Sequence, residues 1–436
     1  METKDLKFGE LDEGFTIKEA IEEAKRCLNC KNPLCIKGCP IENNIPGFIH
    51  QLSMGNIGAA MHIINEKSNL PAICGRVCPH EKQCVGHCVL NAKKRPIQVG
   101  KLERFAADFD GNMGLIRDQI PQKTRGKVAV IGSGPAGLTV AGDLAREGFN
   151  VMIFEGEQEA GGVLMYGIPE YRLPKDVVRK EVKKIEALGV TFITQCMVGQ
   201  AITVDDMFEQ GFDAVFIGSG TALPKSLDTP GYTLRGVTQS SYFLRMASLC
   251  NTGSIGREEV PVKQGDIVGV IGGGNVAMDA ARTALRMGAG KVYVLFRRTM
   301  DQMSALQTEY NEAVEEGVEF LWETTVTEFI GSNGKLEKIR VKTPEGENFM
   351  PIDRILLAIG SRPANRIVST TSGIEVDDTG YVITKERPYG MTTRKGVFAG
   401  GDVVHTPQTV VLAMKEAKQV AKGIAQFVDA KKLLEE

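Results

Sequence analysis

Two segments of the chain share one arrangement of apolar and glycine-rich positions. In each, a short apolar run enters a glycine turn, continues with helical periodicity and ends in a second apolar run. The expected elements are strand 128–131, helix 136–146 and strand 151–155 in the first segment, and strand 267–271, helix 276–287 and strand 292–297 in the second. The repetition predicts a duplicated strand–helix–strand nucleotide fold.

The order of these segments predicts how the domains connect. Two further segments resemble each other, 216–220 followed by Pro224 and 356–360 followed by Pro363, and we interpret them as two crossings between domains. The second nucleotide unit would then be inserted in the first, which resumes and ends in a helix after Thr409. The first 115 or so residues are expected to form short helices and loops, and 118–123 is a plausible linker.

The first glycine turn has the pattern of a dinucleotide site. Its glycines would permit the turn, the approach of a pyrophosphate and close packing of helix on sheet, with the pyrophosphate at the helix N-terminus. Glu155, at the end of the second strand, can accept the two ribose hydroxyls. A tight turn without a ligand is the alternative. The expected binding residues here are Gly132, Gly134, Pro135, Ala136, Gly137 and Glu155.

The second turn differs from the first where its second strand ends. Arg297 and Arg298 stand where the first unit has an acid, and a guanidinium pair suits a 2′-phosphate that an acid would repel. NADPH is therefore preferred over NADH, unless the two arginines merely solvate a loop. The turn itself contributes Gly272, Gly273, Gly274, Asn275 and Val276, and Ala277 replaces the third glycine.

A third glycine-containing motif lies near the C-terminus. Gly401 and Asp402 precede a helix that begins near Thr409. The aspartate could bind the ribityl chain of a flavin, with the helix start facing the pyrimidine end of the ring. As the closing element of a flavoprotein with two nucleotide units, the pattern favours FAD in the first unit.

Composition narrows the class of protein. The 436 residues, 42% of them hydrophobic, suffice for about three packed domains. A net charge of −2, from 52 basic and 54 acidic side chains, provides no electrostatic footprint for nucleic acid or an anionic membrane. No run approaches the roughly 20 apolar residues of a spanning helix, and no secretory signal is evident, so we expect a cytoplasmic protein.

Eight of the ten cysteines lie between Cys27 and Cys88. In a chain of this size without a signal, such clustering favours metal binding over disulfides. The two runs are Cys27-x2-Cys30-x4-Cys35-x3-Cys39-Pro40 and Cys74-x3-Cys78-Pro79-x4-Cys84-x3-Cys88. Two 4Fe–4S clusters are the natural interpretation, and two zinc sites are the alternative.

No redox-active cysteine pair follows the first glycine turn. The remaining cysteines, Cys196 and Cys250, are solitary, and the five histidines form no ligand-spaced group. Electrons would therefore leave the flavin by another route than a disulfide. We assign no catalytic side chain, because the flavin would carry the chemistry.

The motifs together resemble the small (β) subunit of NADPH-dependent glutamate synthase and its relatives. These relatives are the large subunit of NADH-dependent ferredoxin:NADP oxidoreductase and the N-terminal half of dihydropyrimidine dehydrogenase. The resemblance covers nearly the whole chain and rests on the cysteine runs, 132–137, 161–169, 272–282, the Arg297–Arg298 pair and 400–414. It implies an α/β fold with two Rossmann-like domains, arranged as in disulfide reductases but without the redox disulfide, after an α-helical iron–sulfur domain.

The resemblance also implies which residues hold the cofactors. FAD would lie in the first unit and NADPH in the second, with Gly162, Gly360 and Val410 added to the binding residues. The two clusters would have crossed ligation. One would be held by Cys27, Cys30, Cys35 and Cys88, and the other by Cys39, Cys78, Cys84 and Glu103, with Cys74 in place of Glu103 as the alternative.

The expected domains are 1–120 for two 4Fe–4S clusters, 121–234 with 356–436 for FAD, and 235–355 for NADPH. Electrons would pass from NADPH through FAD and the clusters to a second redox subunit that carries the acceptor site. That subunit would be a glutamate synthase large subunit, a ferredoxin:NAD-type partner in flavin-based bifurcation, or a pyrimidine-reducing subunit. A non-catalytic scaffold that senses NADPH is the alternative from another class.

Overall fold

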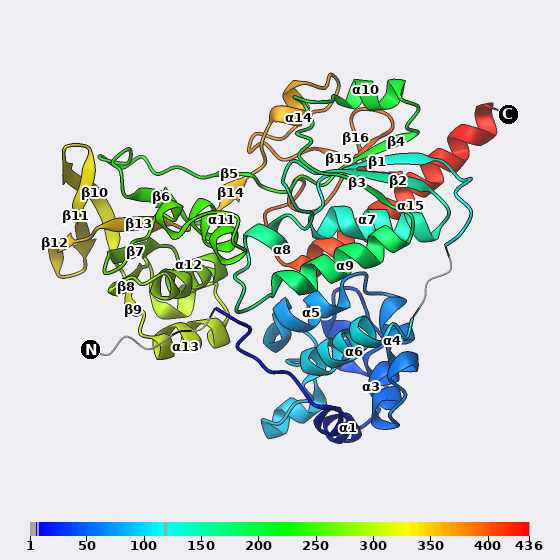
Figure 1. The fold of residues 1–436 in the computed structure, drawn as a ribbon, viewed down its shortest axis with the longest axis horizontal. Coiled ribbons are helices and arrows are strands. Elements are labelled where there is room, and N and C mark those ends of the chain that lie inside the picture. Colours follow the sequence, from blue (N-terminus) through cyan, green and yellow to red (C-terminus); the bar gives the residue numbers. More distant parts are fainter. Residues whose placement is uncertain (1–5, 7, 117–119, 436) are drawn as a thin grey trace. The chain divides into compact units, whose positions relative to one another are not determined.

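A computed structural model describes residues 6, 8–116 and 120–435. These residues divide into two compact units (Figure 1). The larger unit consists of 12–165, 175–223 and 362–436. The smaller unit consists of the N-terminal segment to Leu11, Tyr166–Pro174 and Pro224–Ser361. Residues 118 and 119 of the expected linker lie outside the described residues.

The N-terminal part of the larger unit is helical, as the sequence predicts. Its core is built from apolar side chains of α3, α4 and α6 that are almost fully buried. Thr16 caps α1 in a capping box with Glu19, and Asn44 caps α3. The elements are α1 (Ile17–Lys25), α2 (Leu34–Gly38), α3 (Ile45–Ser53), α4 (Ile57–Asn65), α5 (Pro71–Val77), η1 (His80–Lys82), η2 (Val89–Lys93) and α6 (Val99–Met113).

A seven-stranded sheet forms the rest of the larger unit, in the order β15-β16-β17-β4-β1-β2-β3. The five strands from β17 to β3 are parallel, and β15 and β16 add an antiparallel edge. The strands are β1 (Lys127–Ile131), β2 (Asn150–Phe154), β3 (Thr191–Ile193), β4 (Ala214–Ile217), β15 (Thr384–Glu386), β16 (Tyr389–Thr392) and β17 (Val397–Ala399). Central strands such as β1 are buried on both faces, which explains their unbroken apolar runs.

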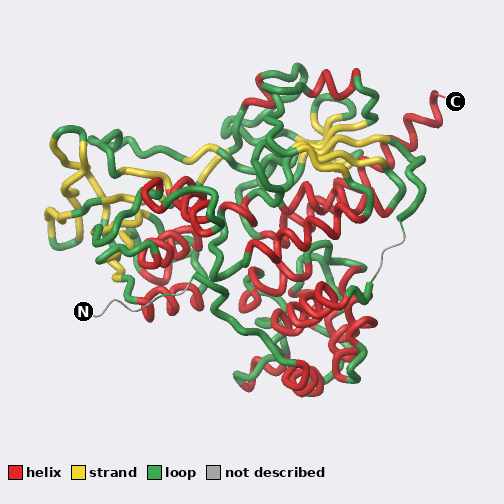
Figure 2. Tube along the Cα trace, in the orientation of Figure 1, coloured by secondary structure: helices red, strands yellow, loops and turns green. Residues whose placement is uncertain are grey.

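Helices cover this sheet and separate it from the N-terminal helices (Figure 2). Asp143 of α7 is bonded to Lys418 of α15 at 3.1 Å and to Asn69 of the N-terminal part at 2.8 Å. The helices are α7 (Pro135–Arg146), α8 (Val163–Tyr166), α9 (Lys175–Ala187), α10 (Val204–Glu209), α14 (Arg366–Ser369) and α15 (Val410–Glu435). The cysteine-rich part and the first nucleotide fold therefore belong to one compact body.

The smaller unit contains a second parallel sheet, in the order β6-β13-β7-β8-β9, and an antiparallel sheet of β10, β11 and β12. The strands are β6 (Val237–Gln239), β7 (Ile267–Ile271), β8 (Lys291–Leu295), β9 (Glu319–Leu321), β10 (Thr325–Ser332), β11 (Lys335–Thr343), β12 (Gly346–Pro351) and β13 (Arg354–Leu357). The helices are α11 (Ser240–Asn251), η3 (Arg257–Glu259), α12 (Asn275–Arg286), η4 (Met300–Gln302) and α13 (Gln307–Glu316).

The chain enters and leaves the central part of the smaller unit through two paired strands, β5 (Leu223–Pro224) and β14 (Ser361–Arg362). The compact unit is larger than the predicted insert 235–355, because its main segment is Pro224–Ser361 and it also takes in two distant segments. Leu11 donates its backbone N–H to the Tyr171 carbonyl at 3.1 Å.

No helix among the described residues has the length and apolar character needed to cross a membrane.

Candidate cofactor sites

The first glycine turn joins β1 to α7. Gly132 has a φ of +93°, and a Cβ there would lie 2.8 Å from the Gly218 carbonyl oxygen. A Cβ at Gly137 would collide with the Gly132 carbonyl oxygen, whereas a Cβ at Gly134 would meet nothing within 4 Å. The backbone beside Gly134 is therefore open where α7 begins, with Pro135 in its first turn. This geometry fits a pyrophosphate cradle.

Glu155 is buried and is the first residue after β2, which ends at Phe154, one residue earlier than the sequence predicts. Its Oε2 atom accepts hydrogen bonds from the backbone N–H, at 2.9 Å, and the hydroxyl of Ser133. Its Oε1 atom accepts from the Glu157 N–H at 2.8 Å. The carboxylate has about four lone-pair sites, and three are used by these bonds, so Oε1 keeps one that is free. The carboxylate is thus fixed beside the turn and can still accept a ribose hydroxyl at Oε1.

Two other predicted glycines lie against this turn. A Cβ on Gly162 would lie 3.1 Å from the Cα of Gly134, and a Cβ on Gly401 would lie 2.9 Å from the Cβ of Ala136. Burial raises the pKa of the adjacent Asp402 carboxyl. Thr409 precedes α15 and accepts backbone hydrogen bonds at its carbonyl from Leu412 and Ala413, and Val410 is the first helical residue. The structure therefore brings the C-terminal motif to the first glycine turn.

The second glycine turn joins β7 to α12 in the smaller unit. Gly272 has a φ of +145°, and a Cβ there would collide with the Ala358 carbonyl oxygen, so the first position is again closed to a side chain. A Cβ on Gly273 would lie 2.5 Å from the Phe296 ring, and one on Gly274 would meet only Ser304, at 3.4 Å. Val276 is half exposed. The backbone is therefore open at Gly274, as it is at Gly134.

The loop of residues 304–306, which no sequence motif indicates, holds this second turn. Asn275 accepts a hydrogen bond from the Leu306 N–H at its side-chain oxygen, at 2.9 Å. The Gly273 carbonyl accepts backbone hydrogen bonds from Ser304 and Ala305 at 3.0 and 3.1 Å. The Asn275 side chain is thus engaged by the protein. Gly360, the last predicted glycine, lies three residues after β13 and accepts the Lys225 N–H at 3.0 Å.

Arg297 and Arg298 are exposed in the turn after β8, which ends at Leu295 and not at 297 as the sequence predicts. Among the residues that the structure describes, neither guanidinium group has a hydrogen-bond or ion-pair partner, although the Arg298 carbonyl accepts the Glu323 N–H at 3.0 Å. The loop backbone is therefore held while both charged groups stay available for an anion.

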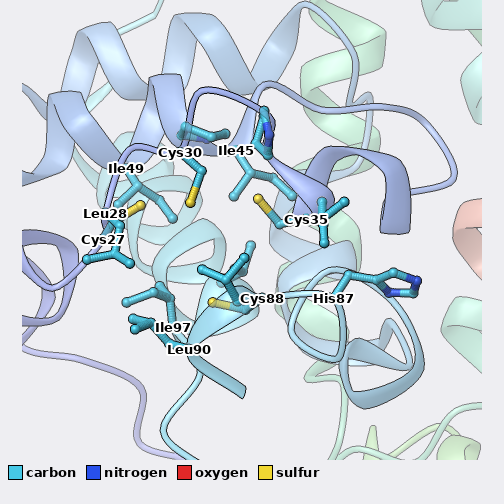
Figure 3. Close-up of a pocket in the computed structure, with 15 residues that line it drawn as sticks. Cys27, Leu28, Cys30, Cys35, Ile45, Ile49, His87, Cys88, Leu90 and Ile97 are labelled. Atoms are coloured by element: carbon cyan, nitrogen blue, oxygen red, sulfur yellow. The ribbon is translucent and has the colours of Figure 1, made fainter. Parts of the chain in front are cut away.

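Four cysteines surround one apolar cavity, which we call the thiol cavity. Cys27, Cys30 and Cys35 come from the first run and Cys88 from the second, and their sulfur atoms point toward a common space (Figure 3). The other lining side chains are largely apolar, including Ile45, Ile49 and Ile97. Burial raises the pKa of Cys35 to about 11 and also raises that of Cys27, so these two thiols need a cation to become thiolate ligands. The cavity fits an iron–sulfur cluster.

The second predicted set is buried more deeply. The thiol of Cys78 is hydrogen-bonded to that of Cys74, whose Sγ also lies 3.5 Å from the Met414 Sδ. Burial also raises the pKa of Cys39 to about 11 and that of Cys84 further, and the charge of Glu103 adds to both shifts. The structure thus gathers all the proposed ligands of the second cluster and leaves both Glu103 and Cys74 beside them.

Glu103 is a buried carboxylate without a hydrogen bond or ion pair among the described residues. Burial, together with the charge of Glu181, raises its pKa to about 8. A lone buried carboxylate is costly unless a cation or hydrogen-bond donor accompanies it. A metal cluster would supply that cation, so the residues fit the group that the sequence predicts.

All ten cysteines are free of disulfides. Among the described residues, no three His, Cys, Asp or Glu side chains converge as ligands of a single ion do. The ligands of a 4Fe–4S cluster bind one iron each, so they lie around a volume larger than that of one ion.

These sites define a class of protein, an oxidoreductase that combines two nucleotide-binding units with an iron–sulfur part. Residues 4–115 match the family model of dihydropyrimidine dehydrogenase domain II, 4Fe–4S cluster, and 126–417 match that of the pyridine nucleotide-disulphide oxidoreductases. The chain belongs to the pyridine nucleotide-disulphide oxidoreductase family, in the branch with an N-terminal 4Fe–4S domain. The fold class and the cofactor classes predicted from the sequence are thereby confirmed.

Relatives of known function align over almost the full chain. The chain is 35% identical to the glutamate synthase [NADPH] small chain of Halomonas elongata, with 98% of this chain and 94% of that one covered. It is 33% identical to the NAD-dependent dihydropyrimidine dehydrogenase subunit PreT of Escherichia coli, with 96% and 97% covered. The predicted resemblance is therefore confirmed.

A solved structure shows the same fold in the nucleotide-binding part. Mycobacterium tuberculosis FprA in complex with NADPH has a TM-score of 0.61 at 18% identity, with 71% of this chain and 86% of that chain covered.

Proposed function

We propose that this protein is the electron-input subunit of a larger oxidoreductase, taking electrons from NADPH and delivering them to a partner through FAD and two 4Fe–4S clusters. The observation that carries the proposal is the pairing of two open glycine turns with opposite charges at their second strands. A buried acid accompanies the first turn, and two unpaired arginines accompany the second. FAD when bound supplies the hydride-accepting ring and the change to single-electron transfer.

The residues of the chain bind and orient the nucleotides. Gly132, Gly134 and Gly137 shape the FAD pyrophosphate site, Glu155 accepts a ribose hydroxyl of FAD, and Asp402 lies where the ribityl chain would run. Gly272 and Gly274 shape the NADPH pyrophosphate site, and Arg297 with Arg298 bind the 2′-phosphate. We assign 1–120 to the clusters, 121–234 with 356–436 to FAD, and 235–355 to NADPH. The thiol cavity would hold one cluster, and Cys39, Cys78, Cys84 and Glu103 the other.

The partner is most consistent with a glutamate synthase large subunit, because the Halomonas elongata relative is a glutamate synthase small chain of nearly the same length. The PreT relative favours a dihydropyrimidine dehydrogenase partner as the second candidate. A ferredoxin:NAD-type subunit is the third. Co-purification of the native complex separates them by the size and cofactors of the co-eluting chain. We place the complex in the cytoplasm, where the thiols stay reduced.

Anaerobic titration with NADPH tests the proposed activity. We expect NADPH to bleach the flavin absorbance band and to support reduction of a small dye, with NADH much less effective. A flavin band that stays oxidised at saturating NADPH would overturn the proposal and favour a nucleotide-sensing scaffold.

A further inference from the structure

The mouth of the thiol cavity is apolar and exposed. Three large apolar side chains that line the cavity are open to solvent, Leu28 at 62%, Leu34 at 44% and Val89 at 42%. They come from the segments that carry the four cysteines. Exposed apolar side chains grouped at one site mark an interaction surface more often than a bare surface. We call these three residues the apolar rim.

A belt of positive charge accompanies the apolar rim. The two segments that border the cavity, 26–41 and 82–98, contain seven Lys and Arg residues and no Asp or Glu, although the whole chain has 52 basic and 54 acidic residues. The seven are Arg26, Lys31, Lys37, Lys82, Lys93, Lys94 and Arg95, and all but Arg26 are exposed. Arg26 is paired with Glu23 at 2.6 Å. Glu23, Glu42 and Glu81 flank these segments, and the local charge remains positive because the basic residues outnumber them.

The thiol cavity is also the more accessible of the two cysteine sets. Its four cysteines are all partly exposed, whereas the deeper set has partly exposed Cys39 and Cys78 but buried Cys74, Cys84 and Glu103. Electron transfer between proteins requires the redox centres to approach closely. A partner would therefore reach the cluster of the thiol cavity first, across the apolar rim.

We infer that the apolar rim and its basic belt dock the redox partner, and that the partner presents an apolar centre ringed by carboxylates. This inference rests on the proposed function and adds the chemistry of the acceptor surface. Opposite charges at the edge steer the encounter and set its orientation, and apolar contact at the centre excludes water. Because basic residues outnumber acidic ones around the apolar rim, a basic partner would be repelled.

Two haem proteins of opposite surface charge serve as probes, acidic cytochrome b5 and basic cytochrome c. The full-length protein is first reduced anaerobically with stoichiometric dithionite and then mixed with each probe in a stopped-flow instrument. Each electron that leaves converts one ferric haem to ferrous haem, so absorbance counts the transfer. Dithionite makes this test independent of whether NADPH is the donor.

We expect cytochrome b5 reduction to slow as ionic strength rises, and the Lys31→Glu/Lys93→Glu variant to lower its rate about tenfold at low salt. The same variant should speed the reduction of cytochrome c. Leu28→Gln should slow the reduction of both probes at every ionic strength, because it removes apolar contact and not charge. The matched control, Lys342→Glu/Lys385→Glu, reverses two exposed charges elsewhere and should change neither rate.

Iron content, acid-labile sulfide and flavin content should be equal in all variants, so a change in rate reports docking and not cofactor loss. The inference would be overturned if the rate of cytochrome b5 reduction changed neither with ionic strength nor with charge reversal. An equal loss of rate in the control variant would also overturn it. Failure of NADPH to bleach the flavin would instead overturn the proposed function.

Discussion

The two glycine turns have nearly the same backbone and opposite electrostatics. Both begin with a glycine at positive φ that leaves no room for a side chain, and both are open at the third residue. At the end of the second strand, however, the first turn has the buried Glu155, fixed by Ser133, and the second has the exposed Arg297 and Arg298. On the proposed assignment, a few side chains outside the turn adapt one fold to two nucleotides.

The helices that start at these turns are also held differently. Asp143 of α7 is bonded by Asn69 and Lys418, and the side chains of Asp143 and Lys418 are partly exposed. Asp279 of α12 is buried and bonded by Arg172 at 2.8 Å, and Arg172 also reaches Glu309 at 2.8 Å. The second turn therefore depends on a buried ionic cluster that includes a segment more than a hundred residues away in sequence.

Reversing the charge at the first turn should have the largest effect. Glu155→Arg places a cation where a ribose hydroxyl binds and breaks the hydrogen bonds with Ser133. We expect purified protein without FAD and without NADPH-dependent dye reduction, measured by flavin absorbance and assay. Glu155→Gln keeps the shape and should retain part of the FAD. Full FAD content in the Arg variant would contradict the assignment of this turn.

Removing the buried clamp of the second turn should come next. Arg172→Met leaves Asp279 buried without its cation, and the loss of one partner from a buried pair costs about 3 kcal/mol or more. We expect the smaller unit to unfold at a lower urea concentration than in the unmodified protein. The fluorescence of Trp322 monitors this unfolding. The control is Arg179→Met, which breaks the more exposed pairs with Glu159 and Asp176 and should cost under about 1 kcal/mol. Equal losses would contradict the clamp.

Substitution of the arginine pair should change the choice between NADPH and NADH, and this effect should be intermediate in size. Arg297→Ala/Arg298→Ala would remove the proposed charge-assisted hydrogen bonds to the 2′-phosphate. A loss of about 2 kcal/mol corresponds to a roughly 30-fold higher KM for NADPH. The KM for NADH should stay the same, as should the FAD content. Steady-state dye reduction with both coenzymes measures the change. Equal increases for NADPH and NADH would show that the arginines only shape the loop.

The smallest effect should come from exchanging the packing residue of the second turn. Ala277→Gly removes a buried methyl group from α12 and should lower the free energy of unfolding by about 1 kcal/mol, with little change in the KM for NADPH. The matched change in the first turn, Gly137→Ala, introduces a Cβ that collides with the Gly132 carbonyl, so it should disturb FAD binding. Similar outcomes for both variants would contradict the comparison of the turns.

Sequence patterns predicted the elements that depend on residues close together in the chain. Apolar runs and glycines specify the strand–turn–helix units, since their turns are constrained by neighbours in the chain. The same patterns placed the strand ends one to two residues too late at Glu155 and Arg297, because both residues lie in the turns that follow.

Contacts between distant segments could not be predicted. Nothing local links Ser133 to Glu155, Asn275 to Leu306, or Arg172 to Asp279, since each pair meets only after the fold has formed. The choice between Glu103 and Cys74 also stays a prediction, because both side chains are buried beside the same thiols.

The central claim is that electrons from NADPH reach iron–sulfur clusters in this chain. The most direct measurement is low-temperature electron paramagnetic resonance of the purified protein after anaerobic addition of NADPH, with iron analysis of the same sample. We expect about eight iron atoms per chain and a reduced 4Fe–4S signal that grows as the flavin band bleaches. A protein with bleached flavin and no iron signal, or with zinc in place of iron, would contradict it.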